Sequence, residues 1–264
     1  MPFPDLKMFR VLAAAAFIAV GPAAAAEVDL ELVLAVDVSR SMDLDEHAVQ
    51  RNGYVEAFRH PDVLNAIASG MTGRIAVTYL EWSGSATGTV VAPWTVIDGH
   101  GSAEAFAATL AAAPIQRLHG TSISNALNQA SALFDESPYQ SHRRVIDVSG
   151  DGPNNMGPAV LSARDAVLAR GIVINGLPIM LKAPDGLYSI RNLDEYYADC
   201  VIGGPGAFLV PVRAIEGFAE AIRRKLVLEI AGWQPMLMLA ADTGRRQAVD
   251  CMVGERLRRM WMDQ

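Results

Sequence analysis

Uninterrupted apolar runs alternate along the chain with segments whose apolar residues recur at helical spacing. The first run, residues 32–36, is typical of a strand buried on both faces of a sheet. Alternation of such strands with helices indicates βαβ units and predicts an α/β fold with a mostly parallel sheet. The six expected strands are residues 32–36, 74–82, 88–97, 144–149, 172–179 and 207–212. The expected helices are residues 41–59, 103–112, a segment ending at 134, 159–169, 193–198 and 215–230. Residues 88–97 follow the preceding strand so closely that we expect them to form an antiparallel edge.

The N-terminal residues have the pattern of an export signal. Lys7 and Arg10 precede an apolar run at 11–20, and the small residues 24–26 suit cleavage. The alternative is a retained membrane anchor, but the apolar stretch is shorter than the roughly 20 residues that span a bilayer and contains a Gly-Pro pair. We therefore predict a signal peptide at 1–26 and a periplasmic or secreted protein.

The overall charge of the chain makes nucleic acid an unfavourable partner. The chain has 264 residues and a net charge of −7, with no basic stripe, which disfavours nucleic-acid binding. After removal of the leader, no other stretch is apolar and long enough to span a membrane, so we expect no stable membrane span.

The C-terminal tail is expected to be tied to the body. Cys200 and Cys251 lie in what should be an oxidising compartment, so a disulfide is the first hypothesis and two unpaired buried thiols are the alternative. Residues 245–262 resemble an amphipathic helix with Arg256, Arg258 and Arg259 on its polar side. We expect this tail to pack on the body; the alternative is contact of its arginines with a partner or an acidic membrane surface.

Three strand ends or turns carry oxygen-bearing side chains. The first strand ends in Asp37-x-Ser39-x-Ser41, Thr121 follows Gly120 and opens a helix, and Asp151 follows the fourth strand. Because parallel strands end on the same edge of a sheet, these turns can converge in space. Two carboxylates and three hydroxyls suit a hard cation, so we expect Mg²⁺, or another divalent cation such as Mn²⁺ or Ca²⁺.

These motifs, in this order, resemble the von Willebrand factor type A domain over about residues 28–230. The resemblance implies a three-layer α/β sandwich with a doubly wound, mostly parallel six-stranded sheet and one antiparallel edge strand. It also implies a metal-ion-dependent adhesion site formed by Asp37, Ser39, Ser41, Thr121 and Asp151. In that site the three hydroxyls bind the cation directly, and the two carboxylates act directly or through water.

More narrowly, the chain is similar to a group of exported bacterial proteins of this fold whose role is undefined. We therefore divide it into the signal peptide (1–26), a von Willebrand type A-like domain (27–230) and a helical C-terminal extension (231–264). One departure concerns the fourth strand, which ends in Ser149-Gly150-Asp151 where the larger family often has Thr-Asp-Gly, so the carboxylate can approach differently. Asp147, inside that strand, is interpreted as structural.

A cation held mainly by hydroxyls keeps much of its charge and attracts an external carboxylate. The expected function is thus non-enzymatic recognition of a protein partner that donates an Asp or Glu. One alternative is a metal-dependent phosphate-ester hydrolase. It is disfavoured because phosphoryl-transfer enzymes of the haloacid dehalogenase type need a second Asp at the position of Ser39. The other alternative is a structural domain with a degenerate site. The five histidines are scattered, so we expect no zinc site, and His119 is read as an exposed loop residue that can border the cation site.

Overall fold

The computed structural model describes residues 25–183, 189–232 and 249–262. The expected signal peptide, residues 1–26, lies outside these ranges except for residues 25 and 26. Residues 245–248 of the expected tail helix also lie outside them. No helix in these three ranges is both long enough and apolar enough to cross a bilayer. The leader and the domain boundaries at 26/27 and 230/231 therefore stay predictions.

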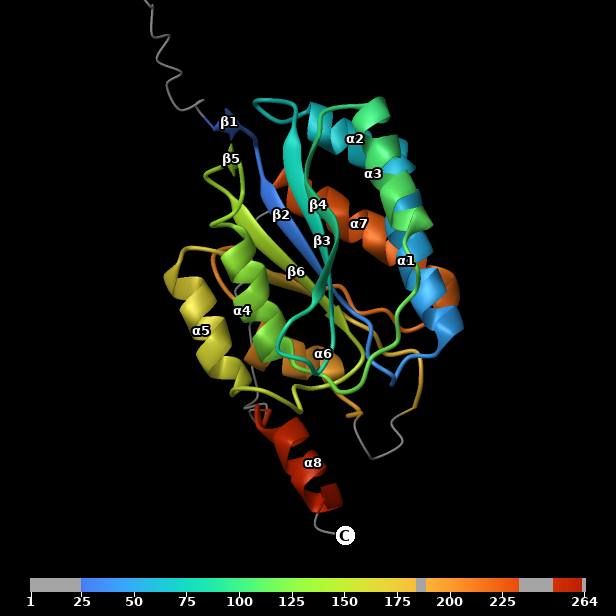
Figure 1. The fold of residues 1–264 in the computed structure, drawn as a ribbon, viewed down its shortest axis with the longest axis vertical. Helices are drawn as coiled ribbons and strands as arrows, with labels where there is room; N and C mark the ends of the chain where they lie inside the picture. The colour runs from blue at the N-terminus through green and yellow to red at the C-terminus, as the bar shows by residue number, and fades with distance from the viewer. Residues whose placement is uncertain (1–24, 184–188, 233–248, 263–264) are drawn as a thin grey trace, which may run out of the picture.

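A central sheet is covered by helices on both faces (Figure 1). The strands are β1 (Ala26–Glu27), β2 (Glu31–Asp37), β3 (Ile75–Trp82), β4 (Thr89–Ile97), β5 (Tyr139–Gln140), β6 (Arg144–Gly150) and β7 (Val173–Pro178). The α-helices are α1 (Leu44–Arg59), α2 (Pro61–Ala68), α3 (His100–Ala112), α4 (Ile123–Leu133), α5 (Val160–Ala169), α6 (Leu193–Tyr196), α7 (Phe218–Ala231) and α8 (Val253–Met262). A π-helical turn (Tyr197–Val201) extends α6, and a 3₁₀ turn (Ile215–Gly217) precedes α7.

The sheet order is β4-β3-β2-β6-β7, with β4 antiparallel to β3 and every other pair parallel. Along β2 alternate residues enter opposite cores, as the two-residue period of a strand requires. Leu34 and Val36 pack on the side of α1, α2, α3 and α7, whereas Val33 and Ala35 pack on the side of α4, α5 and α6. The expected three-layer α/β sandwich with an antiparallel edge is confirmed.

The expected sixth strand, residues 207–212, does not form a continuous ladder. It follows the outer edge of β7 through the isolated bridges Gly176↔Leu209 and Ile179↔Val212. Val210 and Val212 donate their N–H groups to β7, but Pro178 at the end of β7 has no N–H to donate to the Val210 carbonyl, which explains why the bridges stay isolated. The main sheet therefore has five strands, and β1 and β5 form a separate two-stranded sheet that the pattern did not predict.

The helix after β2 begins later than its apolar pattern suggested. Asp43 is the N-cap of α1: its Oδ1 accepts from the N–H of Glu46 at 2.9 Å, and its own N–H donates to Glu46 Oε2 at 2.8 Å. This capping box starts the helix at Leu44 rather than at residue 41. Ser41 is consequently left in the turn, where its side chain is free of helical constraints.

Asp147 belongs to a buried ionic cluster between β6 and α7. Lys225 Nζ lies 2.6 Å from Asp147 Oδ1 and also contacts Glu229 Oε1, and all three side chains are buried. Asn175 Nδ2 donates to Glu229 Oε1 at 3.0 Å. One ammonium group thus faces two carboxylates in the core, which supports a structural interpretation of Asp147.

The expected disulfide is present between Cys200 and Cys251, with 5.5 Å between their Cα atoms. It joins the π-helical turn after α6 to Cys251, two residues before α8 begins. Figure 1 shows α8 below the body, at the end of the molecule to which the carboxyl end of β2 points. The disulfide therefore fixes the start of α8 near that edge of the sheet.

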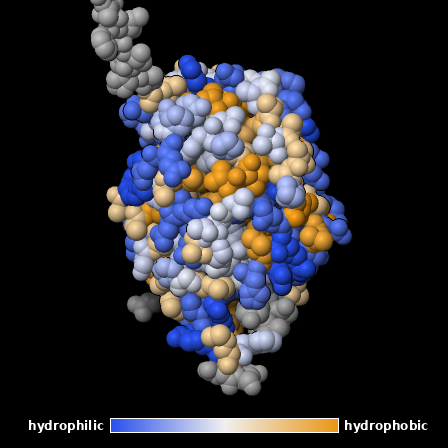
Figure 2. Space-filling view, viewed as in Figure 1, coloured by the Kyte–Doolittle hydropathy of each residue, from blue (hydrophilic) through white to orange (hydrophobic). Residues whose placement is uncertain are grey.

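The surface shown in Figure 2 is mostly polar, with apolar side chains gathered over the region of β4, where Val90 is exposed. Because β4 is an edge strand, its outer backbone groups could pair with another chain. Pro93, in the middle of β4, removes one donor and makes that pairing less favourable.

Candidate metal centre

The turn after β2 places two hydroxyls beside a buried carboxylate. Asp37 Oδ1 accepts from the N–H of Ser39 at 2.7 Å, which folds the chain back on itself. The Ser39 and Ser41 hydroxyls are 2.9 Å apart, and the Ser41 hydroxyl donates to Asp151 Oδ1 at 2.6 Å. Residues 110 positions apart in the sequence therefore meet through one hydroxyl group.

Side chains of neighbouring elements hold the backbone of this turn. From α1, Gln50 Nε2 donates to the Asp37 carbonyl at 3.1 Å, and His47 Nε2 lies 3.0 Å from the Ser39 carbonyl. Arg117 donates to the carbonyls of Arg40 and Met42, at 2.6 and 2.8 Å. These contacts fix the turn before any ligand arrives, and sequence reasoning did not identify them, since His, Gln and Arg at these positions match no motif.

Thr121 is held next to the loop that follows β6. Its N–H donates to Asn155 Oδ1 at 3.1 Å, and its carbonyl accepts from the Asn155 N–H at 2.9 Å. The N-cap of α4 is Ser122, whose hydroxyl accepts from the N–H of Asn125, so Thr121 does not fill that role. Gly120 has φ +80°, a conformation that glycine adopts without strain, and a Cβ there would overlap the Met156 sulfur.

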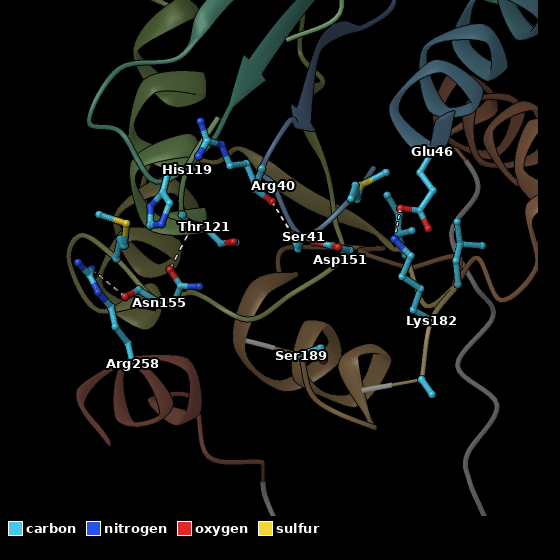
Figure 3. Close-up of a pocket in the computed structure, with 17 residues that line it drawn as sticks. Arg40, Ser41, Glu46, His119, Thr121, Asp151, Asn155, Lys182, Ser189 and Arg258 are labelled. Carbon is cyan, nitrogen blue, oxygen red and sulfur yellow. Dashed lines mark hydrogen bonds and ion pairs between the residues drawn. The ribbon is translucent and has the colours of Figure 1, made fainter. Parts of the chain in front are cut away.

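The five expected site residues converge at the carboxyl edge of the sheet. A cavity of about 440 Å³ is lined by Ser39, Ser41, Thr121 and Asp151, while Asp37 lies fully buried beneath its floor. Figure 3 shows Ser41 and Asp151 at the centre of the cavity, with Thr121, His119 and Asn155 on one side and Glu46 and Lys182 on the other. His119 is exposed and borders the cavity, as expected.

The environment of Asp37 and Asp151 disfavours the negative charges of these two carboxylates. Burial raises the pKa of Asp37 well above its usual range, and the Asp151 carboxylate raises it further. Burial likewise raises the pKa of Asp151 to about 6, although the hydrogen bond from Ser41 acts in the opposite direction. Asp37 Oδ2 is buried and has no hydrogen-bond partner among the described residues. Negative charge here is therefore disfavoured unless a cation offsets it.

The donor set fits a hard cation rather than a soft one. Two carboxylates and three hydroxyls supply only oxygen, the ligand type that Mg²⁺ and Ca²⁺ prefer. Within the described ranges no group of three or more His, Cys, Asp or Glu side chains is arranged to hold a metal. Any cation at this cavity would thus depend on hydroxyls, as the sequence motif requires.

Comparison with known proteins gives a family and a fold. Residues 27–234 match the model of the family described as "Protein of unknown function (DUF1194)". No curated protein sequence matches the chain.

Three solved structures illustrate the fold. The pilus adhesin SpaC from Lactobacillus rhamnosus GG shares 14% identity with a TM-score of 0.59, over 77% of this chain and 31% of that one. Proximal thread matrix protein 1 from the mussel byssus, with a zinc-occupied MIDAS motif, shares 10% identity with a TM-score of 0.59, over 78% and 49%. A von Willebrand factor type A protein from Catenulispora acidiphila shares 16% identity with a TM-score of 0.51, over 77% and 43%.

At these identities the structural likeness concerns the fold alone, and this chain spans half or less of the length of each of the three structures. The family match covers most of the chain, including all five expected site residues. The chain belongs to the DUF1194 family and has the von Willebrand factor type A fold.

Proposed function

We propose that this protein binds a divalent cation, Mg²⁺ in the first instance, through Asp37, Ser39, Ser41, Thr121 and Asp151. The bound cation then recognises a protein partner that donates an Asp or Glu carboxylate. The protein acts in the periplasm or outside the cell, after removal of residues 1–26, and makes or breaks no covalent bond.

The observation that carries this proposal is the hydroxyl relay from Ser39 through Ser41 to Asp151, above the unpartnered Oδ2 of Asp37. Hydroxyls carry no positive charge, so a bound cation would stabilise the anionic forms of the two buried carboxylates. When bound, the cation supplies an open coordination position with residual positive charge. Ser39, Ser41, Thr121 and Asp151 would hold it from the wall of the cavity, and a ligand could reach it through the cavity.

The structural neighbours are consistent with this proposal. The mussel protein has a zinc-occupied MIDAS motif, and SpaC is a pilus adhesin. Both facts concern those proteins. They support the proposal for this chain because the fold is shared with these proteins.

Calorimetric titration with Mg²⁺ tests the cation site. We expect saturable binding by the wild type and a loss of at least tenfold in affinity for Ser39→Ala and for Asp151→Asn, each of which removes one oxygen ligand or its charge. Glu56→Gln is the matched control for charge, because Glu56 is exposed on α1 and lines no part of the cavity. Thermal melts of each variant in EDTA separate lost binding from lost folding.

The proposal would be refuted if folded wild type bound no Mg²⁺, Mn²⁺ or Ca²⁺, or if Ser39→Ala and Asp151→Asn bound as tightly as Glu56→Gln. The first result would leave the structural-domain alternative.

A further inference from the structure

Helix α8 is fastened directly to the loop that carries Asp151. Besides the disulfide at Cys251, Glu255 Oε1 accepts from Asn154 Nδ2 at 2.7 Å. Gly254 is buried, and a Cβ at this position would overlap the Asn154 carbonyl oxygen. Two contacts with Asn154 therefore hold the first turn of α8 against the loop next to the proposed cation site, and the disulfide to Cys200 anchors the residues just before it.

From this position Arg258 reaches the cavity. It lines the cavity, and its Nη1 donates to the Asn155 carbonyl at 3.3 Å, at the long end of hydrogen-bond distances. Figure 3 shows its side chain rising from α8 toward Asn155, across the cavity from Lys182. Among the described residues this is the one hydrogen bond that the Arg258 guanidinium group makes, so its other donors can face a ligand.

The charges on the two sides of the cavity are not equivalent. Lys182 is paired with Glu46 at 2.6 Å, so its charge is compensated within the chain. On α8, Arg256 pairs with Asp250. Arg258, by contrast, has no carboxylate partner in the part of the chain that the structure describes. On the α8 side of the cavity, the charge of the Arg258 guanidinium group is therefore not compensated by a carboxylate of the described residues.

We propose that Arg258 is a specificity-determining residue that binds a second anionic group of the partner. This inference rests on the proposed function, in which one carboxylate of the partner binds the cation. The partner segment would then carry two acidic side chains close in sequence. A guanidinium group binds a carboxylate through two parallel hydrogen bonds, which selects for anionic groups in a defined orientation.

The apolar part of the cavity fits the same ligand. Met42, Met156 and Leu181 line the cavity beside the polar residues. They can contact the methylene groups of a glutamate chain, whereas a bare inorganic anion would leave this surface uncovered. An acidic peptide therefore matches the cavity better than phosphate does.

Fluorescence anisotropy with labelled synthetic peptides tests the inference. The probes are blocked glycine peptides with one glutamate, or with two glutamates separated by zero, one or two glycines, measured in Mg²⁺ and in EDTA. We expect at least one two-glutamate peptide to bind the wild type about tenfold more tightly than the one-glutamate peptide, and only with Mg²⁺ present. Arg258→Ala should remove this preference while leaving Mg²⁺ affinity and the melting temperature unchanged.

Arg259→Ala is the matched control, because Arg259 is exposed on the same helix, carries the same charge and does not line the cavity. Arg40→Ala tests the other arginine that lines it. The inference is overturned if one-glutamate and two-glutamate peptides bind equally, if the preference survives Arg258→Ala, or if Arg40→Ala alone removes the preference. In each of these cases, Mg²⁺-dependent binding of the one-glutamate peptide would still support the proposed function. The inference is also overturned if Mg²⁺ binds but no peptide does. Absence of Mg²⁺ binding would overturn both.

Discussion

Replacing Glu229 by glutamine should stabilise the protein at alkaline pH. In the buried cluster a single ammonium group, on Lys225, faces two carboxylates, so only one negative charge is compensated. Burial raises the pKa of Glu229 to about 7, and the Asp147 carboxylate adds to the effect. Glutamine keeps an oxygen that can accept from Asn175 but carries no charge.

The magnitude follows from the two pKa values. Glu229 titrates near its usual 4.5 in the unfolded chain and near 7 in the folded one, so ionisation destabilises the folded state progressively between these pH values. Each pH unit between them is worth about 1.36 kcal/mol, which gives about 3 kcal/mol once the pH exceeds 7. The penalty is absent below pH 4.5. Glu229→Gln should therefore exceed the stability of the wild type by less than about 1 kcal/mol at pH 5 and by up to about 3 kcal/mol at pH 8.

Urea unfolding followed by circular dichroism at pH 5, 6, 7 and 8 measures this difference. Asp37 and Asp151 also have raised pKa values, but they are present in both proteins and cancel when the two free energies of unfolding are subtracted. Glu56→Gln, at an exposed position, should show no pH trend. A difference between Glu229→Gln and wild type that is the same at pH 5 and pH 8 would refute the reasoning, provided that the slopes of the urea curves agree.

Three further outcomes are expected. Chelation by EDTA of Mg²⁺ present at about 100 times its dissociation constant should lower the melting temperature by roughly 5–10 °C. Binding to the folded state alone stabilises it by about 2.7 kcal/mol at that concentration. An unchanged melting temperature would argue against a structural cation. The double variant Cys200→Ser/Cys251→Ser should lose up to about 4 kcal/mol in urea unfolding under oxidising conditions, as the closure of a loop with a sequence separation of 51 residues predicts, and reductant should affect the wild type alone. N-terminal sequencing of the exported protein should begin at Glu27, and an intact Met1 in the membrane fraction would favour the anchor instead.

Sequence patterns were sufficient for the fold because most of its strands are long and apolar. All seven residues of β2 are buried, so the uninterrupted apolar run at 32–36 was sufficient to identify the strand. The segment 207–212 misled for an equally physical reason: its apolar residues do lie beside β7, but Pro178 of β7 lacks the N–H that would complete the pairing and make the segment a strand. Apolar patterning reports burial, and hydrogen bonding depends on details that it does not include.

The candidate site was predictable only in part. Asp37, Ser39 and Ser41 occur in one short motif, and strand topology accounts for the approach of Asp151. Asn155 had no such signal, and Arg258 was singled out only with Arg256 and Arg259 as a residue that could contact a partner; their places beside the cavity depend on contacts between segments far apart in the sequence. The start of α1 was predictable from the sequence, since Asp43 and Glu46 have the spacing of a capping box. The apolar pattern instead led us to expect the helix to begin at residue 41.

The disulfide also has a consequence for the order in which the cavity is completed. The residues that line it extend from Ser39 to Arg258, so the chain must be synthesised as far as Arg258 before all of them can assemble. The bond at Cys251 fastens the last of these segments and requires an oxidant. A chain shortened after α7 keeps the hydroxyl relay but loses Arg258. Tight binding of a doubly acidic partner would therefore distinguish full-length, oxidised molecules from truncated or reduced ones.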